Sequence, residues 1–438
     1  MNILECAKEL DQEYKIFNTI AENLSLGTKG ALKGYSVSVK DNICVKGMES
    51  RAGSKILEGY IPPFDATVVS KCRSEGGFIL GKTSQDEFGF GTFNINTPYN
   101  IPLNPFDVSR SAGGSSGGAA VLTAVADFPH VAVAESTGGS ISCPASWCGV
   151  VGITPTYGRT SRWGLIDYAN SLDKIGCMGK TVREAAMLLS VISGPDKYDS
   201  TVLHEEVPDF TSYVGAPISD MKVGVPEEYF GEGVDDGVSK TVRDALQELE
   251  SRGAELLETS LPFTKYSLSS YYIIAMAEAS TNLAKLCGLR YGLQLPLEGN
   301  FDEYFSKVRG LGFGDEAKRR IILGTYARLA GYRDAYYLKA LKVRTRVIED
   351  FRRAFKLVDV LAAPTMPVVA PRFDEIEEME PIQHYMIDIL TVAPNLAGIP
   401  MISVPCGEYQ GLPVGLHIMG DHLEESKIIR VSSSLGVS

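Results

Sequence analysis

The sequence predicts an α/β protein in which a β-sheet is covered by helices on both faces. Three observations indicate this fold class. Strand-like and helix-like segments alternate over the first 136 residues, long helical patterns dominate from about residue 238 to 355, and strand-like runs return after residue 356. Because the returning strands can complete the earlier sheet, we expect residues 1–438 to form one domain with a mainly helical insertion at about 238–355.

The first part of the chain supplies the alternation. Apolar residues with helical spacing predict an amphipathic helix over residues 3–24, and period-two alternation predicts a strand that ends near Lys40. A short apolar run bounded by glycines predicts a buried strand at 77–83. The remaining expected elements are a helix at 65–75, a helix at 118–126 and a strand at 130–135.

The second part opens with "DMKVGVPEEYF" at 220–230 and continues into the helical stretch. Strand-like runs then follow at 357–365, 400–407 and 411–420. No internal repeat or linker separates the two parts, which favours a single folded unit.

Composition and charge narrow the class of protein. A formal net charge of −12 opposes binding of a phosphate backbone over the whole surface, so any nucleic acid is expected to be held by a partner. The N-terminal residues lack the basic start and apolar core of a secretory signal, and no apolar run is long enough to span a bilayer, which predicts a cytoplasmic protein. The eight cysteines are scattered without zinc-ligand spacing, so we expect free thiols and no metal site.

One phosphate-binding motif matches by letters alone. The segment "GGFILGKT" at 76–83 satisfies the pattern G-x-x-x-x-G-K-[ST]. A phosphate loop needs an open turn after a strand and a helix directly behind it, whereas the variable positions here are mostly large and apolar and no good helix follows Thr83. The segment is therefore expected to be a strand, and a nucleotide-binding switch remains a minor alternative.

Two glycine-serine segments are stronger candidates for chemistry. "GGSSGG" at 113–118 places Ser115 in the G-x-S-x-G pattern that exposes a nucleophilic serine, and "TGGS" at 137–140 repeats the theme. A serine hydrolase of that type needs a histidine base, but His417 and His422 have no distinctive setting. Lys40, at the end of a predicted strand, is the remaining candidate base, because an apolar setting favours the neutral form of a lysine amine.

The segments "VSVKDNI", "GGSSGG", "STGGSISCPASWCGVVGITPTYGR" and "GLIDYANSLDKIG" together resemble the amidase signature family in order and spacing. The resemblance implies a single large mixed β-sheet and a Ser-cisSer-Lys triad. In that triad Ser140 is the nucleophile, Ser115 is the bridging serine after a cis peptide bond, and Lys40 is the base. Ser140 would attack an amide carbonyl and release ammonia from an acyl-enzyme.

The same resemblance gives the glycines of the second loop a purpose. Without side chains on Gly138 and Gly139, the N–H groups from Thr137 to Ser140 can point at one oxyanion, which is usually a large electrostatic contribution to catalysis. Thr137, Gly138 and Gly139 are therefore the expected oxyanion hole.

The second half of the chain narrows the resemblance to one branch of the family. The segments "SYYIIAMAEASTNLAKLCGLRYG", "GDEAKRRIILGTYARLAGYRDAYYLKALKVRT" and "IDILTVAPNLAGIPMISVPCG" are similar to the A subunits of tRNA-dependent amidotransferases. This branch implies a glutaminase that passes ammonia to a tRNA-binding B subunit, which amidates Glu-tRNA(Gln) or Asp-tRNA(Asn) with ATP and magnesium. A small C subunit would complete a heterotrimer, and no cofactor is implied for this chain itself.

The same branch also implies a glutamine-binding set, Tyr271, Arg320 and Asp388. Arg320 suits the α-carboxylate as a fork-shaped donor, and Asp388 suits the α-ammonium. The adjacent Arg319 is an alternative to Arg320. A stand-alone amidase for small amides is the alternative function, although it would not need this pair of opposite charges.

Three positions depart from the family pattern. Ser136 stands where the family usually has aspartate, Ser142 where it has arginine, and Phe90 where the amidotransferase branch commonly has methionine. These changes are expected to affect loop support and pocket lining and to leave the triad intact.

Overall fold

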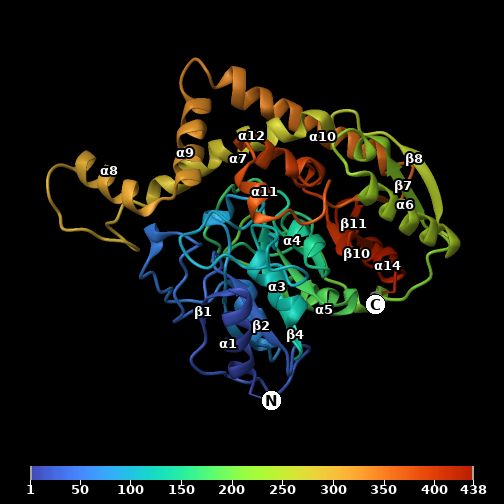
Figure 1. Ribbon diagram of the computed structural model, residues 1–438, viewed down its shortest axis with the longest axis horizontal. Coiled ribbons are helices and arrows are strands. Elements are labelled where there is room, and N and C mark those ends of the chain that lie inside the picture. Colours follow the sequence, from blue (N-terminus) through green and yellow to red (C-terminus); the bar gives the residue numbers. More distant parts are fainter. Residues whose placement is uncertain (1, 437–438) are drawn as a thin grey trace.

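The computed structural model describes residues 2–436 and is built on one mixed sheet (Figure 1). Within those residues the sheet has 11 strands in the order β1-β3-β2-β4-β6-β5-β10-β11-β9-β7-β8. The predicted α/β fold with a single mixed sheet is thereby confirmed. The strands are β1 (Phe17–Ile20), β2 (Ser36–Lys40), β3 (Phe78–Thr83), β4 (His130–Ser136), β5 (Val151–Thr154), β6 (Lys174–Gly179), β7 (Lys222–Pro226), β8 (Glu255–Thr259), β9 (Val360–Pro364), β10 (Met401–Tyr409) and β11 (Leu412–Gly420).

Helices cover both faces of this sheet. One core joins the sheet to α2, α5, α6 and α14, and two further cores join its other face to α1, α3 and α4 and to α7, α10 and α13. The helices are α1 (Ile3–Tyr14), α2 (Thr67–Ser74), α3 (Gly117–Val125), α4 (Ser142–Trp147), α5 (Val182–Ile192), α6 (Asp236–Ser251), α7 (Ser267–Asn282), α8 (Phe301–Gly312), α9 (Asp315–Arg328), α10 (Lys339–Ala354), α11 (Phe373–Glu377), α12 (Pro381–Met386), α13 (Val392–Ala397) and α14 (Glu425–Ser433).

Alternation within the central strands explains the two-sided burial. In β4, Val131 and Val133 pack into one core while Ala132 and Ala134 pack into the core on the opposite face. Successive side chains of a strand point to opposite faces, so the apolar residues of β4 fill the cores on both faces of the sheet.

The N-terminal segment differs from the prediction. The expected helix at 3–24 ends at Tyr14, because Lys15 adopts a left-handed conformation (φ 59°) and stops the helix. The Asp11 carboxylate then accepts the N–H of Phe17, and Phe17–Ile20 forms β1 antiparallel to β3. The apolar residues that suggested two more helical turns instead form an edge strand.

The segment with the phosphate-loop letters is a strand, as predicted. All six residues of β3 are buried, and the Lys82 ammonium donates to Ser50 Oγ at 2.8 Å and lies 3.7 Å from the Asp41 carboxylate. Burial lowers the pKa of Lys82. The lysine is committed to this internal contact, so the segment offers no phosphate cradle.

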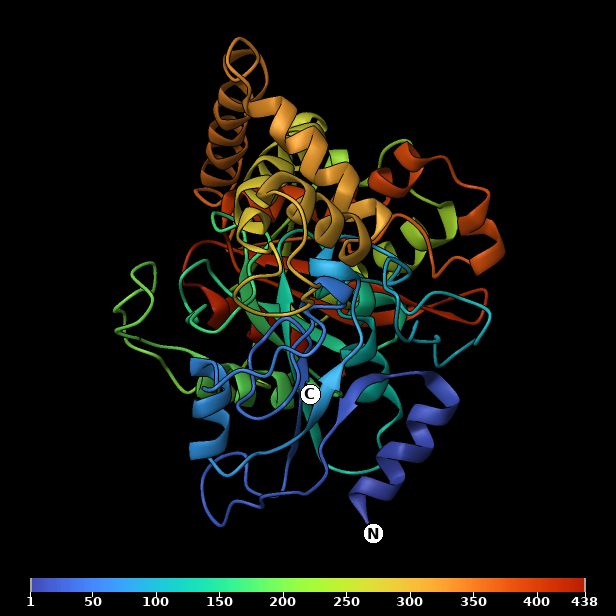
Figure 2. The same ribbon diagram turned by 90° about the vertical axis from the view of Figure 1, so that its left-hand side faces the viewer.

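The stretch at 238–355 contains most of α6 and all of α7, α8, α9 and α10, and β8 lies inside it. β8 pairs in parallel with β7 and forms one edge of the sheet. In Figures 1 and 2 the orange connection between α9 and α10 stands out from the body of the molecule. In the part of the chain that the structure describes, no helix combines the length and apolar character needed to cross a membrane.

Candidate active site

Lys40 and Ser115 meet at the end of β2. Lys40 is the last residue of that strand and is fully buried, and its Nζ lies 2.8 Å from Ser115 Oγ. The peptide bond between Gly114 and Ser115 is cis, as the family resemblance implies. The sheet therefore holds a buried amine against the serine that precedes α3.

Ser140 lies in the loop after β4, and a backbone hydrogen bond ties this loop to the first one. The N–H of Ser116 donates to the carbonyl oxygen of Ser140 at 3.2 Å. Ser140 is 6% exposed, whereas Ser115 and Lys40 are fully buried. Of the three residues, Ser140 is thus the one that a substrate can reach.

The two glycines before Ser140 are closely surrounded. A Cβ atom at Gly138 would lie 2.7 Å from the Tyr271 hydroxyl oxygen, and one at Gly139 would lie 2.6 Å from Thr391 Oγ1. Within the described residues, the N–H groups of Gly138, Gly139 and Ser140 donate to no other protein group. These N–H groups lie in the loop for which the sequence predicts an oxyanion hole.

Arg320 enters the site from α9 and is 3% exposed. Its Nε donates to Glu316 Oε1 at 2.7 Å, and another nitrogen donates to the Tyr168 hydroxyl at 2.6 Å. Its guanidinium carbon lies 5.0 to 5.7 Å from the ring centroids of four aromatic residues. Those residues are Phe90, Tyr168, Tyr272 and Tyr385.

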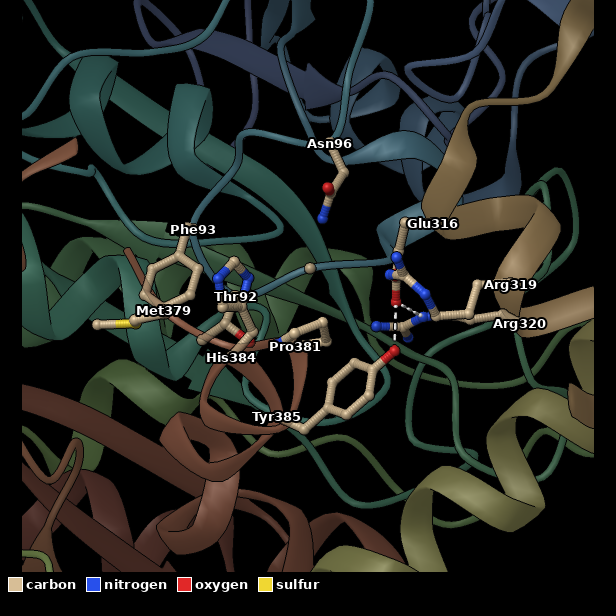
Figure 3. A pocket seen from close by; sticks show the side chains of 11 residues that line it. Thr92, Phe93, Asn96, Glu316, Arg319, Arg320, Met379, Pro381, His384 and Tyr385 are labelled. Carbon is tan, nitrogen blue, oxygen red and sulfur yellow. Dashed lines mark hydrogen bonds and ion pairs between the residues drawn. The ribbon is translucent and has the colours of Figure 1, made fainter. Parts of the chain in front are cut away.

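Arg319 points differently, although it also contacts Glu316. Its side chain is 46% exposed and binds Glu316 Oε2 from the surface. Figure 3 shows Glu316 between these two arginines and the Tyr385 hydroxyl, which donates to Glu316 at 2.9 Å. Of the two alternatives left open by the sequence, Arg320 is the one buried among aromatic side chains.

Asp388 and Tyr271 complete the predicted binding set. Asp388, in the short helix η8 (Ile387–Leu390), accepts hydrogen bonds from Thr92 at 2.9 Å and from the Tyr272 hydroxyl at 2.6 Å. Burial raises the pKa of Asp388, and these two hydrogen bonds oppose that shift. Tyr271 stacks edge-on against Tyr272 with ring centroids 5.0 Å apart. Tyr271 thus connects the Asp388 side of the site to Gly138.

A cavity of about 220 Å³ opens beside Arg320 (Figure 3). Its described lining includes Arg320, Thr92 and Tyr385, but not Tyr271, Asp388 or the three triad candidates. Tyr168 links the two regions, because it binds Arg320 and its ring approaches the backbone at Gly89, next to Ser115 Oγ. The structure therefore brings the predicted residues into one neighbourhood, with the Arg320 side open to the cavity.

Sequence reasoning missed several residues of this neighbourhood. Tyr168 and Glu316 hold Arg320, Thr92 and Tyr272 hold Asp388, and Glu135 contacts Lys40. Only Glu316 carried a usable signal, because it stands four residues before Arg320 on a predicted helix.

The buried histidines take no part in the site. His417 Nε2 lies 3.5 Å from Ser142 Oγ, and burial lowers the pKa of His417 to about 3. His130 contacts Ser36 and Ser38 and has a pKa lowered by burial to about 3 as well. The group beside Ser115 is an amine, so a Ser-His pair built on Ser115 is excluded.

Glu87, in η2 (Glu87–Gly89), fixes the start of α9. Its carboxylate accepts the N–H of Gly314 at 3.0 and 3.1 Å and the Ser54 hydroxyl at 2.5 Å. Burial nevertheless raises the pKa of Glu87 to about 7. Helix α9 carries Arg320, so the protonation of Glu87 affects the stability of the region around Arg320.

We expect wild type to lose stability relative to Glu87→Gln as pH rises from about 5 to about 7. The folded state has the raised pKa and binds the extra proton in this window, whereas glutamine does not ionise. The difference in free energy of unfolding should change by about 2 kcal/mol. Denaturant titrations at both pH values measure it, and a difference that does not vary with pH would contradict the prediction.

Comparison with known proteins identifies the family to which the chain belongs. A protein-family model described as Amidase matches residues 5–429. This chain belongs to the amidase family. It is 49% identical to the A subunit of the glutamyl-tRNA(Gln) amidotransferase of Methanococcoides burtonii over 92% of this chain and 84% of that protein. The corresponding protein of Persephonella marina is 46% identical over 98% and 86%.

Solved structures of the family agree with this assignment. The crystal structure of the A subunit of the glutamyl-tRNA(Gln) amidotransferase of Thermotoga maritima matches with a TM-score of 0.84 and 38% identity, over 98% of this chain and 89% of that one. The peptide amidase of Stenotrophomonas maltophilia matches with a TM-score of 0.74 and 30% identity, over 93% and 82%. The amidase-family chain is accordingly an enzyme of the hydrolase type.

The three departures from the family pattern have separate surroundings. Phe90 is fully buried, packs edge-on against Tyr168 at 4.6 Å and lies under the Arg320 guanidinium. Ser136 Oγ donates to the carbonyl oxygen of Gly138 at 3.1 Å, and Ser142 faces His417. Phe90 therefore contributes to the binding region, and Ser136 supports the glycine loop.

Proposed function

We propose that this chain is the glutaminase subunit of a tRNA-dependent amidotransferase. The observation that carries the proposal is the pairing of a Lys40–Ser115 contact with a buried Arg320 and a buried Asp388 in the same neighbourhood. One fixed positive group and one fixed negative group suit the α-carboxylate and the α-ammonium of an amino acid. Relatives at 46 to 49% identity, which are named as A subunits of glutamyl-tRNA(Gln) amidotransferases, support the same choice.

The proposed reaction begins with transfer of the Ser140 proton. As Ser140 Oγ attacks the side-chain amide carbon of glutamine, its proton passes to Ser115 Oγ, and the Ser115 proton passes to Lys40 Nζ. A carbon–oxygen bond forms, and the carbonyl oxygen becomes an oxyanion. The N–H groups of the Thr137, Gly138 and Gly139 loop stabilise that charge.

Collapse of this intermediate releases ammonia. The leaving nitrogen takes the proton back from Lys40 through Ser115, the carbon–nitrogen bond breaks, and a glutamyl ester of Ser140 remains. Water then attacks the ester with the same relay acting in reverse, which yields glutamate. Tyr271, Arg320 and Asp388 hold the amino-acid end during both steps.

The remaining parts of the reaction belong to partners. We propose that a tRNA-binding B subunit uses ATP and magnesium to activate the glutamyl group of Glu-tRNA(Gln) or the aspartyl group of Asp-tRNA(Asn), and that a small C subunit completes the assembly. The net charge of −12 fits a chain that leaves tRNA binding to its partner. No cofactor is proposed for this chain itself.

The test is purification of the assembly from the native cell, followed by assays with glutamine, ATP and each mischarged tRNA. We expect glutamine-dependent amidation of at least one tRNA and its loss when this chain is left out of the reconstituted assembly. Exogenous ammonium should restore amidation without this chain. If the purified chain hydrolyses simple amides but not glutamine, and no partner copurifies, it is a stand-alone amidase.

A further inference from the structure

The amine of Lys40 has a second buried partner besides Ser115. Its Nζ lies 2.9 Å from Glu135 Oε2 and 2.9 Å from the backbone oxygen of Glu135. Lys40 is fully buried and Glu135 is 1% exposed, so this is an ion pair without solvent. With Ser115, the three acceptors match the three hydrogens of an ammonium group.

The same geometry suits the neutral amine. A neutral lysine has two N–H donors and one lone pair. If the two donors bind the two oxygens of Glu135, the lone pair points at Ser115, which is the direction from which the proton arrives. Glu135 thus occupies two of the three positions around Nζ in either protonation state.

The second carboxylate oxygen of Glu135 is fixed as well. Thr137 Oγ1 lies 2.8 Å from Glu135 Oε1 and 2.8 Å from Asp173 Oδ1. The single hydroxyl hydrogen of Thr137 can serve only one of the two carboxylates at a time. Burial, followed by the charge of Glu135, raises the pKa of Asp173 well above its usual range. Thr137 thus fixes the Glu135 carboxylate oxygen that does not contact Lys40.

We propose that Glu135 is a positioning residue for the proposed glutaminase reaction: it aims the lone pair of Lys40 at Ser115 and stabilises the ammonium that Lys40 becomes when it accepts the proton. The inference rests on the proposed function only for the identity of the amide. A carboxylate behind the base has the same two effects in Ser-His-Asp triads.

Other charged groups lie near the Lys40–Glu135 pair and contribute to its electrostatic environment. Asp173 approaches Glu135 from the segment before β6, and Asp86 approaches Lys40 from the segment before η2. Arg320, from α9, lies on the other side of Asp86 and acts on that carboxyl. Burial raises the pKa of Asp86 to about 6. Asn42, which is neutral, donates to Glu135 Oε2 at 3.1 Å. Glu135 is the carboxylate in direct contact with Lys40, so its removal should have the largest effect on the base.

The test compares the pH profiles of wild type and Glu135→Gln with glutamine and with a small primary amide, propionamide. We expect kcat to fall by about 100-fold with KM for glutamine unchanged, because orientation and charge stabilisation are both lost. The acid limb of kcat/KM should move to lower pH by about one unit, because an ammonium without its counter-charge gives up its proton more readily. An unchanged limb and kcat would overturn the proposal.

Two further variants separate this role from a structural one. Glu135→Asp keeps the charge, so we expect its acid limb at the wild-type position with a reduced kcat and an unchanged KM. If Glu135→Gln does not fold, the Glu135→Asp variant decides the question. The proposal is then overturned if Glu135→Asp has the wild-type kcat, or if only its KM differs from wild type. Glu425→Gln is the matched control, because Glu425 is fully buried, accepts the N–H of Thr156 at 3.0 Å and should move neither limb nor kcat.

The two substrates keep the two proposals distinguishable. If wild type hydrolyses propionamide but not glutamine, the glutaminase function fails, while the role of Glu135 is still decided on propionamide. If wild type hydrolyses glutamine and Glu135→Gln does so with the same pH profile, the glutaminase function stands and the role of Glu135 is wrong.

Discussion

Replacement of Ser140 by alanine is expected to lower kcat for glutamine hydrolysis by a factor of about 10⁴ or more. The substitution removes the only oxygen of the proposed triad that the substrate reaches, since Ser140 is 6% exposed and the other two members are fully buried. It removes one small hydroxyl for which no hydrogen bond is part of the described fold, so the melting temperature should stay within a few degrees of wild type. Ammonia release in single-turnover and steady-state assays measures the effect.

Ser142→Ala is the matched control for this prediction. Ser142 lies two residues further along, is 1% exposed and has its hydroxyl 3.5 Å from His417 Nε2. If the chemistry used a Ser-His pair, this variant would lose activity and Ser140→Ala would not. We expect the reverse, because burial lowers the pKa of His417 to about 3 and none of the described contacts aligns its other ring nitrogen. Near-normal ammonia release by Ser140→Ala would reject the nucleophile assignment.

The sequence predicted those elements whose residues fit either a strand pattern or a helical pattern but not both. β3, β4 and β11 each contain a short apolar stretch between turn residues, and the sequence placed each of them within about two residues. β1 was missed because Phe17–Ile20 continue the helical spacing of α1 beyond Lys15, and only the tertiary pairing with β3 decides otherwise. β8 was missed because it is a short edge strand with acidic residues, which a helical region does not exclude.

The candidate site was predictable only where whole segments resembled the family. Lys40 and Lys82 illustrate the limit, because both are fully buried at the ends of neighbouring strands. Lys82 meets Asp41 and Ser50, whereas Lys40 meets Ser115 and Glu135. Those partners lie up to 95 residues away along the chain, in loops and in β4, and no local spacing encodes them. The contacts of Glu135 and Tyr168 follow from packing, so they emerged only from the structure.

Arg320→Ala is expected to raise KM for glutamine by roughly 100-fold, which corresponds to about 3 kcal/mol of lost binding. The side chain supplies the buried positive charge of the site, and its loss also leaves the Glu316 carboxylate without its buried partner. The effect should fall mainly on KM, because Arg320 holds the amino-acid end of the substrate and not the reacting amide. Steady-state kinetics at several glutamine concentrations separates KM from kcat.

Arg319→Ala is the matched control for Arg320→Ala, because it removes the same charge from the neighbouring position. Both arginines come from the same turn of α9 and both bind Glu316, but the Arg319 side chain is 46% exposed and that of Arg320 is 3% exposed. Water solvates the Glu316 oxygen that an exposed arginine leaves, so an exposed ion pair contributes little. We therefore expect KM to change less than about threefold in Arg319→Ala. Equal effects of the two substitutions would mean that both act through Glu316 and the start of α9. A larger effect of Arg319→Ala would move the carboxylate-binding role to the outer arginine.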